Sequence, residues 1–452
     1  MHKSHLIPLI SEEMKAVVRL GAPIITGQLA QMSMGFVDTI MAGNLSPNDL
    51  AAVAIGSSFI NPVFVFAIGL FMSLNPIIAQ HIGAGRIDQI GRTVRHAGYL
   101  AFFLAAFSVL ILLKSDLLLA RMGLDESVAV LSFGYIKAVL WGFLPITLYL
   151  VMRFFNEGMS VSKPTMWFAV LGLCFNILGN YTFMYGKFGF PALGAVGTGW
   201  ASALVAWVMF IGMLIYTAGK KSYAHLHIFT SIKKPEWHFI TDILKVGVPN
   251  GISIFMEVSM FAAVSLLMGI LGTTIVAGHQ IAINIGSLIF MIPLGFSSAI
   301  SVRVGTYIGQ NSAYSAKIAG YSGIALCVGI SVFTALLLLI FPNQMVSIYT
   351  SDLVVTQIAV SLLFLASVFQ ISDALQVSSL GALRGLKDTT IPMIVNLIAY
   401  WVVGLPSGYL LGITLKQGPT GLWIGLILGL SVAAILHTLR FFKLSRRHAI
   451  PV

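Results

Sequence analysis

Charged residues are scarce in this chain. They make up 9% of its 452 residues, whereas hydrophobic residues make up 58%. An ordinary soluble domain is about 25% charged, so this composition excludes a soluble globular protein and indicates a chain embedded in lipid. Cysteine is rare as well. Cys174 and Cys327 both fall within apolar runs, and they suggest neither a disulfide framework nor a metal site.

The motifs of intramembrane enzymes are also missing. The sequence has no HExxH pair, no GxSxG elbow and no clustered metal ligands in its apolar runs, so we expect neither an enzyme nor a resident cofactor. The net charge of +11 could indicate a nucleic-acid partner. However, the basic residues are scattered between apolar runs and form no basic domain, so we expect no nucleic-acid binding.

Long apolar runs dominate the sequence. About 20 apolar residues are needed to cross a bilayer, and twelve runs meet this length. They lie near 16–40, 50–80, 93–113, 128–152, 164–185, 193–217, 239–268, 274–301, 315–341, 353–380, 390–412 and 420–441. Turn signals such as GNLSPND, GLKDTT and KQGPTG separate several of them. The sequence therefore predicts an all-α polytopic membrane protein with twelve transmembrane helices.

The basic residues are distributed unequally between the two sides of such a protein. If the N-terminus is cytoplasmic, 21 of the 26 Lys and Arg residues fall on the cytoplasmic side. Cytoplasmic loops are enriched in these residues, so both termini are expected in the cytoplasm. The opening MHKSHLIPLISEEMK contains two acids and no small-residue cleavage site, which argues against a signal peptide.

The two halves of the chain resemble each other. When the sequence is shifted by 226 residues, Gly21 meets Gly247, Pro23 meets Pro249, and Gly69 meets Gly295. We therefore predict two six-helix lobes, residues 1–218 and 239–452, joined by a cytoplasmic linker at residues 219–238. Because each half holds an even number of spans, the lobes form a parallel repeat, with a substrate site expected between them.

Pro23 and Pro249 occupy equivalent places in the first helix of each half. A proline inside a transmembrane helix frees a backbone carbonyl and permits a kink. These two residues are therefore candidate hinges, although proline is also ordinary in membrane helices.

Three acidic residues stand out because they fall within predicted spans: Asp38, Glu257 and Asp373. A charge at the centre of a membrane helix costs about 2.5–3.5 kcal/mol on insertion scales, so such acids usually mark an ion site or a transport path. At the shift of 226, Glu257 meets Gln31 and Asp38 meets Val264. Acids that break the symmetry of a repeat indicate a task other than folding. The alternative is a hydrogen-bonded carboxyl group that stabilises helix packing.

Polar residues accompany two of these acids. Phe369 and Gln370 precede Asp373 by four and three residues, and Gln376 follows it by three, so they share one helical face. Carboxylate and amide oxygens suit a hard cation such as Na⁺, and a desolvated carboxyl group also holds a proton. Asn176 and Asn180, four residues apart, form a similar stripe in the first half or join helices by hydrogen bonds.

Several stretches resemble one known family. MGFVDTIMAG, FMEVS, AGHQIAIN, SVRVG, DALQ, LRGLKD and YGKFG are similar, in the same order, to motifs of the multidrug and toxic compound extrusion family, and within it of its NorM-type bacterial branch. The resemblance runs over nearly the whole chain. It implies twelve helices in two lobes with an outward-opening central cleft. It also implies export of organic cations, driven by an inward Na⁺ or H⁺ gradient through alternating access.

The resemblance also assigns roles to residues. Asp38 corresponds to the acid of the N-terminal lobe, with Asn176, Asn180 and Thr198 as its polar companions. Glu257 and Asp373 correspond to the cation site of the C-terminal lobe, while Gln280 and Phe369 line the drug path. In related sodium-coupled members a tyrosine precedes the second of these acids by four residues, whereas this chain has Phe369. The missing hydroxyl group leaves Na⁺ and H⁺ both open as coupling ions, with Na⁺ preferred.

The implied partners are small organic cations, amphipathic drugs such as dyes and fluoroquinolones, a monovalent cation and membrane lipid. The implied location is the inner membrane of a bacterium, where we expect a monomer. The alternative function within the same superfamily is a flippase for lipid-linked precursors. Such proteins often carry a cationic cavity, whereas this sequence places acids in its spans and nearly all of its Lys and Arg in loops.

Overall fold

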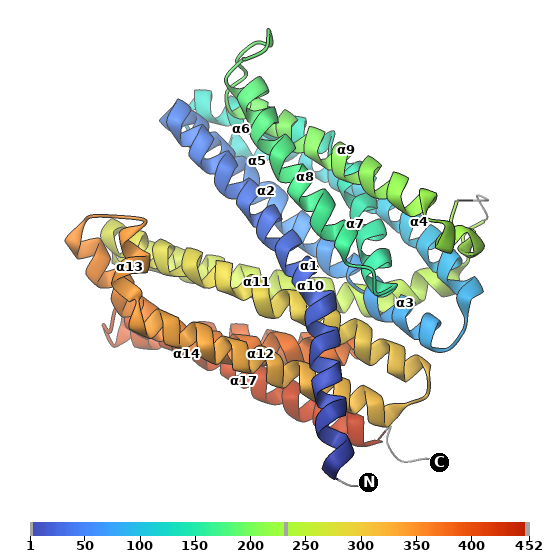
Figure 1. The fold of residues 1–452 in the computed structure, drawn as a ribbon. Helices are drawn as coiled ribbons and strands as arrows, with labels where there is room; N and C mark the ends of the chain where they lie inside the picture. Colours follow the sequence, from blue (N-terminus) through green and yellow to red (C-terminus); the bar gives the residue numbers. More distant parts are fainter. Residues whose placement is uncertain (1–2, 230–233, 448–452) are drawn as a thin grey trace. The chain divides into compact units, whose positions relative to one another are not determined.

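A computed structural model describes residues 3–229 and 234–447, and all regular secondary structure in these ranges is helical (Figure 1). The first half contains α1 (Lys3–Leu45), α2 (Pro47–Phe71), α3 (Leu74–Gly83), α4 (Ile87–Leu112), α5 (Ser115–Leu119), α6 (Glu126–Leu140), α7 (Phe143–Gly158), α8 (Lys163–Gly179), the π-helix η1 (Asn180–Met184), α9 (Ala195–Gly219) and the 3₁₀-helix η2 (Lys221–Leu226). The second half contains α10 (Trp237–Leu271), α11 (Thr273–Gly309), α12 (Ala313–Ile340), α13 (Pro342–Ser347), α14 (Leu353–Gly385), α15 (Thr390–Leu397), the π-helix η3 (Ile398–Gly404), α16 (Leu405–Tyr409), the π-helix η4 (Leu410–Thr414) and α17 (Pro419–Arg447). All twelve predicted spans fall on helices.

Ten helices of the described chain are long and apolar enough to cross a membrane, or eleven when α6 and α7 count as one span bent by 47°. The helix α1 is 43 residues long but is not among them. It carries Arg19, Gln28, Gln31 and Asp38 within its predicted span, which lowers its hydropathy. The chain is therefore a multi-pass membrane protein, and the number of twelve spans stays a prediction.

The chain divides into two compact units that are discontinuous in sequence. Unit 1 comprises Met1–Ile25, Asn75–Gly85 and Val248–Val452, and unit 2 comprises Thr26–Leu74 and Arg86–Gly247. The first helix of each half, α1 and α10, contributes residues to both units. The division falls two residues after Pro23 in α1 and two residues before Pro249 in α10.

Unit 2 is organised around α9, which packs against α6, α7 and α8. Small residues allow this close approach. A Cβ atom at Gly199 would lie 2.7 Å from the Ala138 side chain on α6, and one at Gly179 would lie 2.9 Å from Ala201 on α9. In lipid, helix association depends on packing of this kind because the hydrophobic effect does not drive it.

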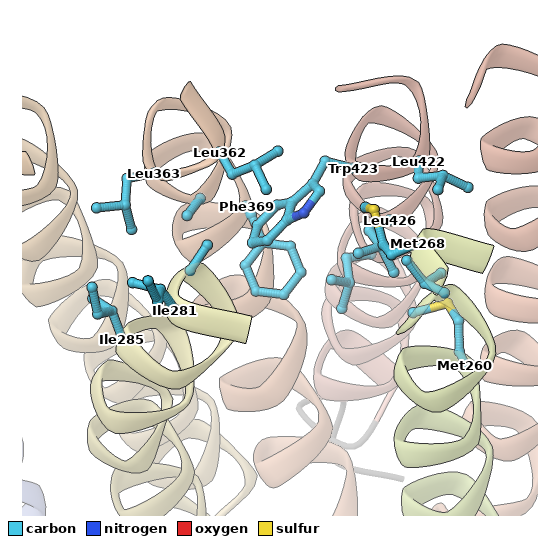
Figure 2. Packing of buried hydrophobic residues seen from close by; sticks show 14 of the residues in the cluster. Met260, Met268, Ile281, Ile285, Leu362, Leu363, Phe369, Leu422, Trp423 and Leu426 are labelled. Atoms are coloured by element: carbon cyan, nitrogen blue, oxygen red, sulfur yellow. The ribbon is translucent and has the colours of Figure 1, made fainter. Parts of the chain in front are cut away.

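Unit 1 is organised around α14, which packs against α11, α12 and α17. One of its close helix contacts joins α16 and α17, where a Cβ atom at Gly425 would lie 2.3 Å from Gly408 Cα. A buried apolar cluster, shown in Figure 2, connects α10, α11, α14 and α17 and includes Met260, Phe369 and Trp423.

Two other acids have a structural role. Asp49 lies in the first turn of α2, where it accepts a hydrogen bond from the Ser46 hydroxyl group (2.6 Å) and the Ala195 backbone N–H (2.6 Å). Asp352 precedes α14 and accepts hydrogen bonds from the N–H groups of Val354 and Val355. Such N-terminal acids satisfy otherwise unpaired donors of the first helical turn. The acids inside the spans do not occupy such positions.

Candidate functional site

In each unit a cavity of about 240 Å³ lies at the same position of the repeat. In unit 2 the lining includes Gln31, Ile60, Asn61 and Phe64, and in unit 1 it includes Glu257, Gly286, Ser287 and Phe290. Each residue of the second set follows its counterpart in the first by 226 positions. The walls of the two cavities thus come from equivalent helices, α1 and α2 in unit 2 and α10 and α11 in unit 1.

The cavity of unit 2 contains the predicted acid Asp38 together with Asn176. The side-chain amides of Asn176 and Asn180 both donate to Asp38 Oδ1, over 2.9 and 2.6 Å. The two asparagines are one turn apart, Asn176 in α8 and Asn180 at the start of η1. The structure therefore brings these three predicted residues together, with two amide groups donating to one oxygen of the carboxylate.

Thr198 lies elsewhere in this unit. It is fully buried on α9, its hydroxyl group has no hydrogen-bond partner among the described residues, and it does not line the cavity. The π-helical geometry at η1 begins directly at Asn180. Wider π-helical turns of this type are frequent at functional sites because they redirect side chains.

The cavity of unit 1 contains Glu257, Asp373 and Phe369. Asp373 is 2% exposed, and its Oδ1 atom has no hydrogen-bond partner among the described residues. The two carboxylates interact electrostatically. A pair of acids in an apolar cavity repels until a cation or a proton is shared between them.

Aromatic rings form one wall of this cavity. The ring of Phe369 lies 5.8 Å from that of Trp423 and 5.9 Å from that of Phe261, and Figure 2 shows Phe369 beside Trp423. The Trp423 indole N–H donates to His279 Nδ1 (3.2 Å), and His279 Nε2 lies 3.1 Å from the Ser265 hydroxyl group. His279 therefore holds the Trp423 ring of this wall in place through its hydrogen bonds to Trp423 and Ser265.

The remaining predicted residues lie outside the two cavities. Gln280 is exposed on α11, beside the buried His279, and does not line the unit 1 cavity. Gln370 donates to the Gly286 carbonyl group (3.0 Å) and so joins α14 to α11. Pro23 and Pro249 lie inside α1 and α10. The roles of Gln280 and of the two prolines stay predictions.

The expectation that nearly all basic residues lie in loops is wrong, because many of them lie on helices, and Arg153 and Arg384 are buried there. Each is 2% exposed inside a helix, Arg153 on α7 and Arg384 on α14. Both stand close to the end of a predicted span, which is why the count of residues by side assigned them to the cytoplasm. For Arg153 the signal in the sequence was the acid four residues later, Glu157, with which it forms an ion pair. Asp388, four residues after Arg384, pairs with Arg440 instead.

Two further buried residues were not predicted. Asn396 and Tyr400 follow Asn176 and Asn180 by 220 positions and are 0% exposed. Tyr400 interacts electrostatically with Glu257 and Asp373. Neither polar atom of the Asn396 side chain has a partner among the described residues. A buried unpartnered amide one turn from Tyr400 could supply an oxygen ligand to a cation.

Together these groups offer oxygen atoms and negative charge within apolar walls. Carboxylate, amide and hydroxyl oxygens are ligands for a hard cation, while the aromatic rings attract organic cations through their faces. The same negative charge can therefore attract a small inorganic cation, a proton or a cationic amphiphile.

Comparison with known proteins gives a consistent result. A sequence model of the MatE family matches residues 23–182 and 249–410. The two matched segments begin 226 residues apart, the same offset that relates the two cavities. A single model that matches twice is what an internal repeat predicts.

Curated relatives are similar over almost the whole chain. The chain is 39% identical to the multidrug resistance protein NorM of Vibrio vulnificus, over 97% of both chains. It is 40% identical to the multidrug resistance protein MdtK of Yersinia enterocolitica, over 96% of both chains. Among solved structures, an outward-facing multidrug resistance MATE family transporter of the MOP superfamily matches the fold with a TM-score of 0.89 at 24% identity, over 99% of both chains.

Proposed function

Because the chain belongs to the MatE family, whose members are transport proteins, we propose that it is a multidrug efflux antiporter. It exports cationic and amphipathic organic compounds, such as dyes and fluoroquinolone-type drugs, in exchange for an inward flow of Na⁺ or H⁺. The names of the relatives in Vibrio and Yersinia support the drug export. The observation that carries the exchange is the presence of acids in both apolar cavities, Asp38 in one and Glu257 with Asp373 in the other.

The physical basis of the exchange is competition for negative charge. A carboxylate in an apolar cavity is costly unless a cation or a proton neutralises it. An organic cation and a coupling ion can each supply this neutralisation, so binding of one weakens binding of the other. Export against a gradient requires only that the two ligands favour different states of the transporter.

Na⁺ is our preferred coupling ion, and H⁺ is the alternative. Glu257 and Asp373 provide carboxylate oxygens in one cavity, and the Ser287 hydroxyl group lies in the same lining. Phe369 contributes a ring face without a hydroxyl group, so this cavity lacks one oxygen ligand that a tyrosine would supply. Asp38, Asn176 and Asn180 form the second site, where their hydrogen bonds leave one carboxylate oxygen available for a cation or a proton.

We also propose the cellular setting. The predicted excess of basic residues on one side supports a multi-pass protein of the bacterial inner membrane with both termini in the cytoplasm. The organisation into two complete units supports a monomer as the working form.

A lipid flippase is less well supported. Arg153 and Arg384 are buried cations, but each lies within electrostatic range of an acid. Neither cavity therefore gains the net positive charge that a diphosphate headgroup would require.

Transport by purified protein in vesicles tests the proposal. Ethidium transport is measured in proteoliposomes while Na⁺ and H⁺ gradients are imposed separately. We expect ethidium to move against its gradient with at least one of the two ions, and the Asp373→Asn variant to lose this movement. Ethidium transport that does not depend on either the Na⁺ or the H⁺ gradient would refute the antiport. Transport lost on removal of Na⁺ alone would identify Na⁺ as the coupling ion.

A further inference from the structure

Unit 1 contains a further cavity, which shares no residue with the two acid-containing cavities. It has a volume of about 390 Å³ and lies between the N-terminal part of α1 and the first turns of α12, both of which belong to unit 1. Its lining includes Ile10 and Met14 of α1 and Tyr314, Lys317, Tyr321 and Ala325 of α12. The proposed antiport assigns no task to this cavity.

The cavity lies at the depth where lipid headgroups are expected. Ile10 and Met14 stand just before the predicted span at 16–40, and Tyr314 and Lys317 flank the start of the predicted span at 315–341. The proposed topology puts both of these span ends at the cytoplasmic face. A phospholipid of the cytoplasmic leaflet would therefore meet the protein at this level.

The lining from α12 changes from polar to apolar along the helix. Tyr314, Lys317 and Tyr321 are separated by three and four residues, so they share one helical face. Ala325 continues the lining one turn deeper into the predicted span, and α1 contributes only apolar side chains. Hydroxyl and ammonium groups at one end, with apolar side chains beyond them, fit an amphiphilic ligand.

No acid cancels the positive charge of Lys317. Lys317 is half-buried and forms no ion pair within residues 3–229 and 234–447. Glu13 lies between Ile10 and Met14 in the sequence, but its carboxylate already accepts hydrogen bonds from Arg303 (2.7 and 3.1 Å) and from the Tyr307 hydroxyl group (2.5 Å). The cavity thus keeps an uncompensated cation.

A second cation stands beside the tyrosine of this cavity. The guanidinium group of Arg446 on α17 lies 4.0 Å from the centroid of the Phe442 ring, which in turn lies 6.3 Å from the Tyr321 ring. The Tyr321 hydroxyl group is 3.5 Å from that of Ser445, the residue before Arg446. Arg446 is exposed and has no acidic partner in the part of the chain that the structure describes. The helix α17 therefore adds positive charge to the polar end of the cavity.

We propose that this cavity binds an anionic phospholipid of the cytoplasmic leaflet. The ammonium group of Lys317 attracts the phosphate, and the hydroxyl groups of Tyr314 and Tyr321 are donors for its oxygen atoms. An acyl chain follows the apolar lining between α1 and α12. Basic pockets between transmembrane helices on the cytoplasmic side recognise anionic headgroups in this way. The lipid site does not depend on the proposed antiport.

Lipid binding to the purified full-length protein tests the site. Native mass spectrometry in detergent compares phosphatidylglycerol, which is anionic, with phosphatidylcholine, which is zwitterionic and has the same acyl chains. One basic residue near an anionic lipid surface contributes about a fivefold preference. We therefore expect phosphatidylglycerol to bind about fivefold more tightly than phosphatidylcholine, and Lys317→Gln to remove this preference.

Matched variants separate the cavity from general attraction to lipid. Lys317→Arg keeps the charge and should keep the preference. Lys15→Gln removes an equal charge one residue after Met14 but outside the lining, so it should leave the preference unchanged. Ala325→Phe fills the apolar part and should weaken binding of both lipids. Its control is Val332→Phe on the same helix, where Val332 is 41% exposed and does not line the cavity.

Three results would overturn the lipid site. The first is equal binding of the two lipids by the parent protein, and the second is an equal loss of preference in Lys317→Gln and Lys15→Gln. The third is displacement of phosphatidylglycerol by inorganic phosphate together with unchanged binding by Ala325→Phe, which would identify a site for free phosphate. Asp373→Asn should bind phosphatidylglycerol as the parent does, so failure of the antiport would not affect this test.

Discussion

The two cavities have equivalent walls but different polar contents. In unit 2 a single carboxylate, Asp38, is held by two asparagine amides, whereas the cavity of unit 1 contains two carboxylates, Glu257 and Asp373. The repeat thus preserves the apolar shell and changes the charged groups inside it. This difference indicates that apolar packing, which both units share, positions the helices. The charged side chains inside the cavities can therefore differ between the units and serve function.

The largest effect is expected when unit 1 is made to resemble unit 2. Glu257→Gln introduces the residue found at the equivalent position 31. Two unit charges 4 Å apart attract by about 4 kcal/mol at an effective dielectric constant near 20, so cation-driven ethidium export should fall by about a hundredfold or more. Transport in proteoliposomes measures this, with the exposed Glu126→Gln as control. Unchanged ethidium export by Glu257→Gln at equal expression would show that Glu257 does not bind the coupling cation.

The next largest effect concerns two acids that form ion pairs with arginines, Glu157 with Arg153 and Asp388 with Arg440. Glu157→Gln leaves Arg153 buried without its ion pair, which should lower the free energy of unfolding by about 3–5 kcal/mol. Asp388→Asn breaks a partly exposed pair with Arg440 and should cost about 0–1 kcal/mol. Thermal unfolding in detergent, followed by tryptophan fluorescence, compares the two. Equal shifts in the unfolding midpoint would show that burial does not distinguish these pairs.

The amides around Asp38 should have a smaller effect. Asn180→Ala removes one of two hydrogen bonds to a carboxylate, each worth about 1.5–3 kcal/mol. We expect the affinity of unit 2 for a cation or proton to change by about tenfold or more, and Asn176→Ala to act in the same direction. Thr198→Ala should have little effect because Thr198 does not line the cavity. A larger change in cation affinity for Thr198→Ala than for Asn180→Ala would contradict this geometry.

The smallest effect tests the shared packing. Gly425→Ala places a methyl group 2.3 Å from Gly408 Cα and should cost about 1–3 kcal/mol in stability. The control Gly98→Ala, on α4, meets nothing within 4 Å and should stabilise its helix by about 0.5–1 kcal/mol. The difference in thermal midpoint between the two variants measures the effect. An unchanged thermal midpoint for Gly425→Ala would mean that α16 and α17 can move apart without a loss of stability.

Much of this architecture can be predicted from the sequence, because membrane-spanning helices require long apolar runs. All twelve predicted spans fall on helices, and the offset of 226 relates both the matched family segments and the cavity linings. Asn176 and Asn180 both contact Asp38, an association that the family resemblance implied and that their spacing alone did not predict. The bend between α6 and α7 and the π-helices were not predicted, since they arise from packing and not from composition.

The buried arginines were missed for a physical reason. A count of basic residues by side depends on where a span ends, and an arginine within the last turns of a helix is indistinguishable from one in the following loop. Only the structure shows that Arg153 and Arg384 are buried, Arg153 in an ion pair with Glu157. Similarly, Gln280 shares a motif with the buried His279 but lies on the exposed side of α11.

In the proposed antiport, a small cation and a larger cationic guest compete for the carboxylates of the two cavities. Equilibrium binding of ethidium to the purified protein in nanodiscs, with Na⁺ concentration and pH varied independently, measures this competition directly. We predict that one of the two ions weakens ethidium binding by about five- to 150-fold, the usual range of coupling between sites, and that Glu257→Gln/Asp373→Asn removes most of this effect. Ethidium affinity that is unaffected by Na⁺ and by pH in the unaltered protein would contradict the account.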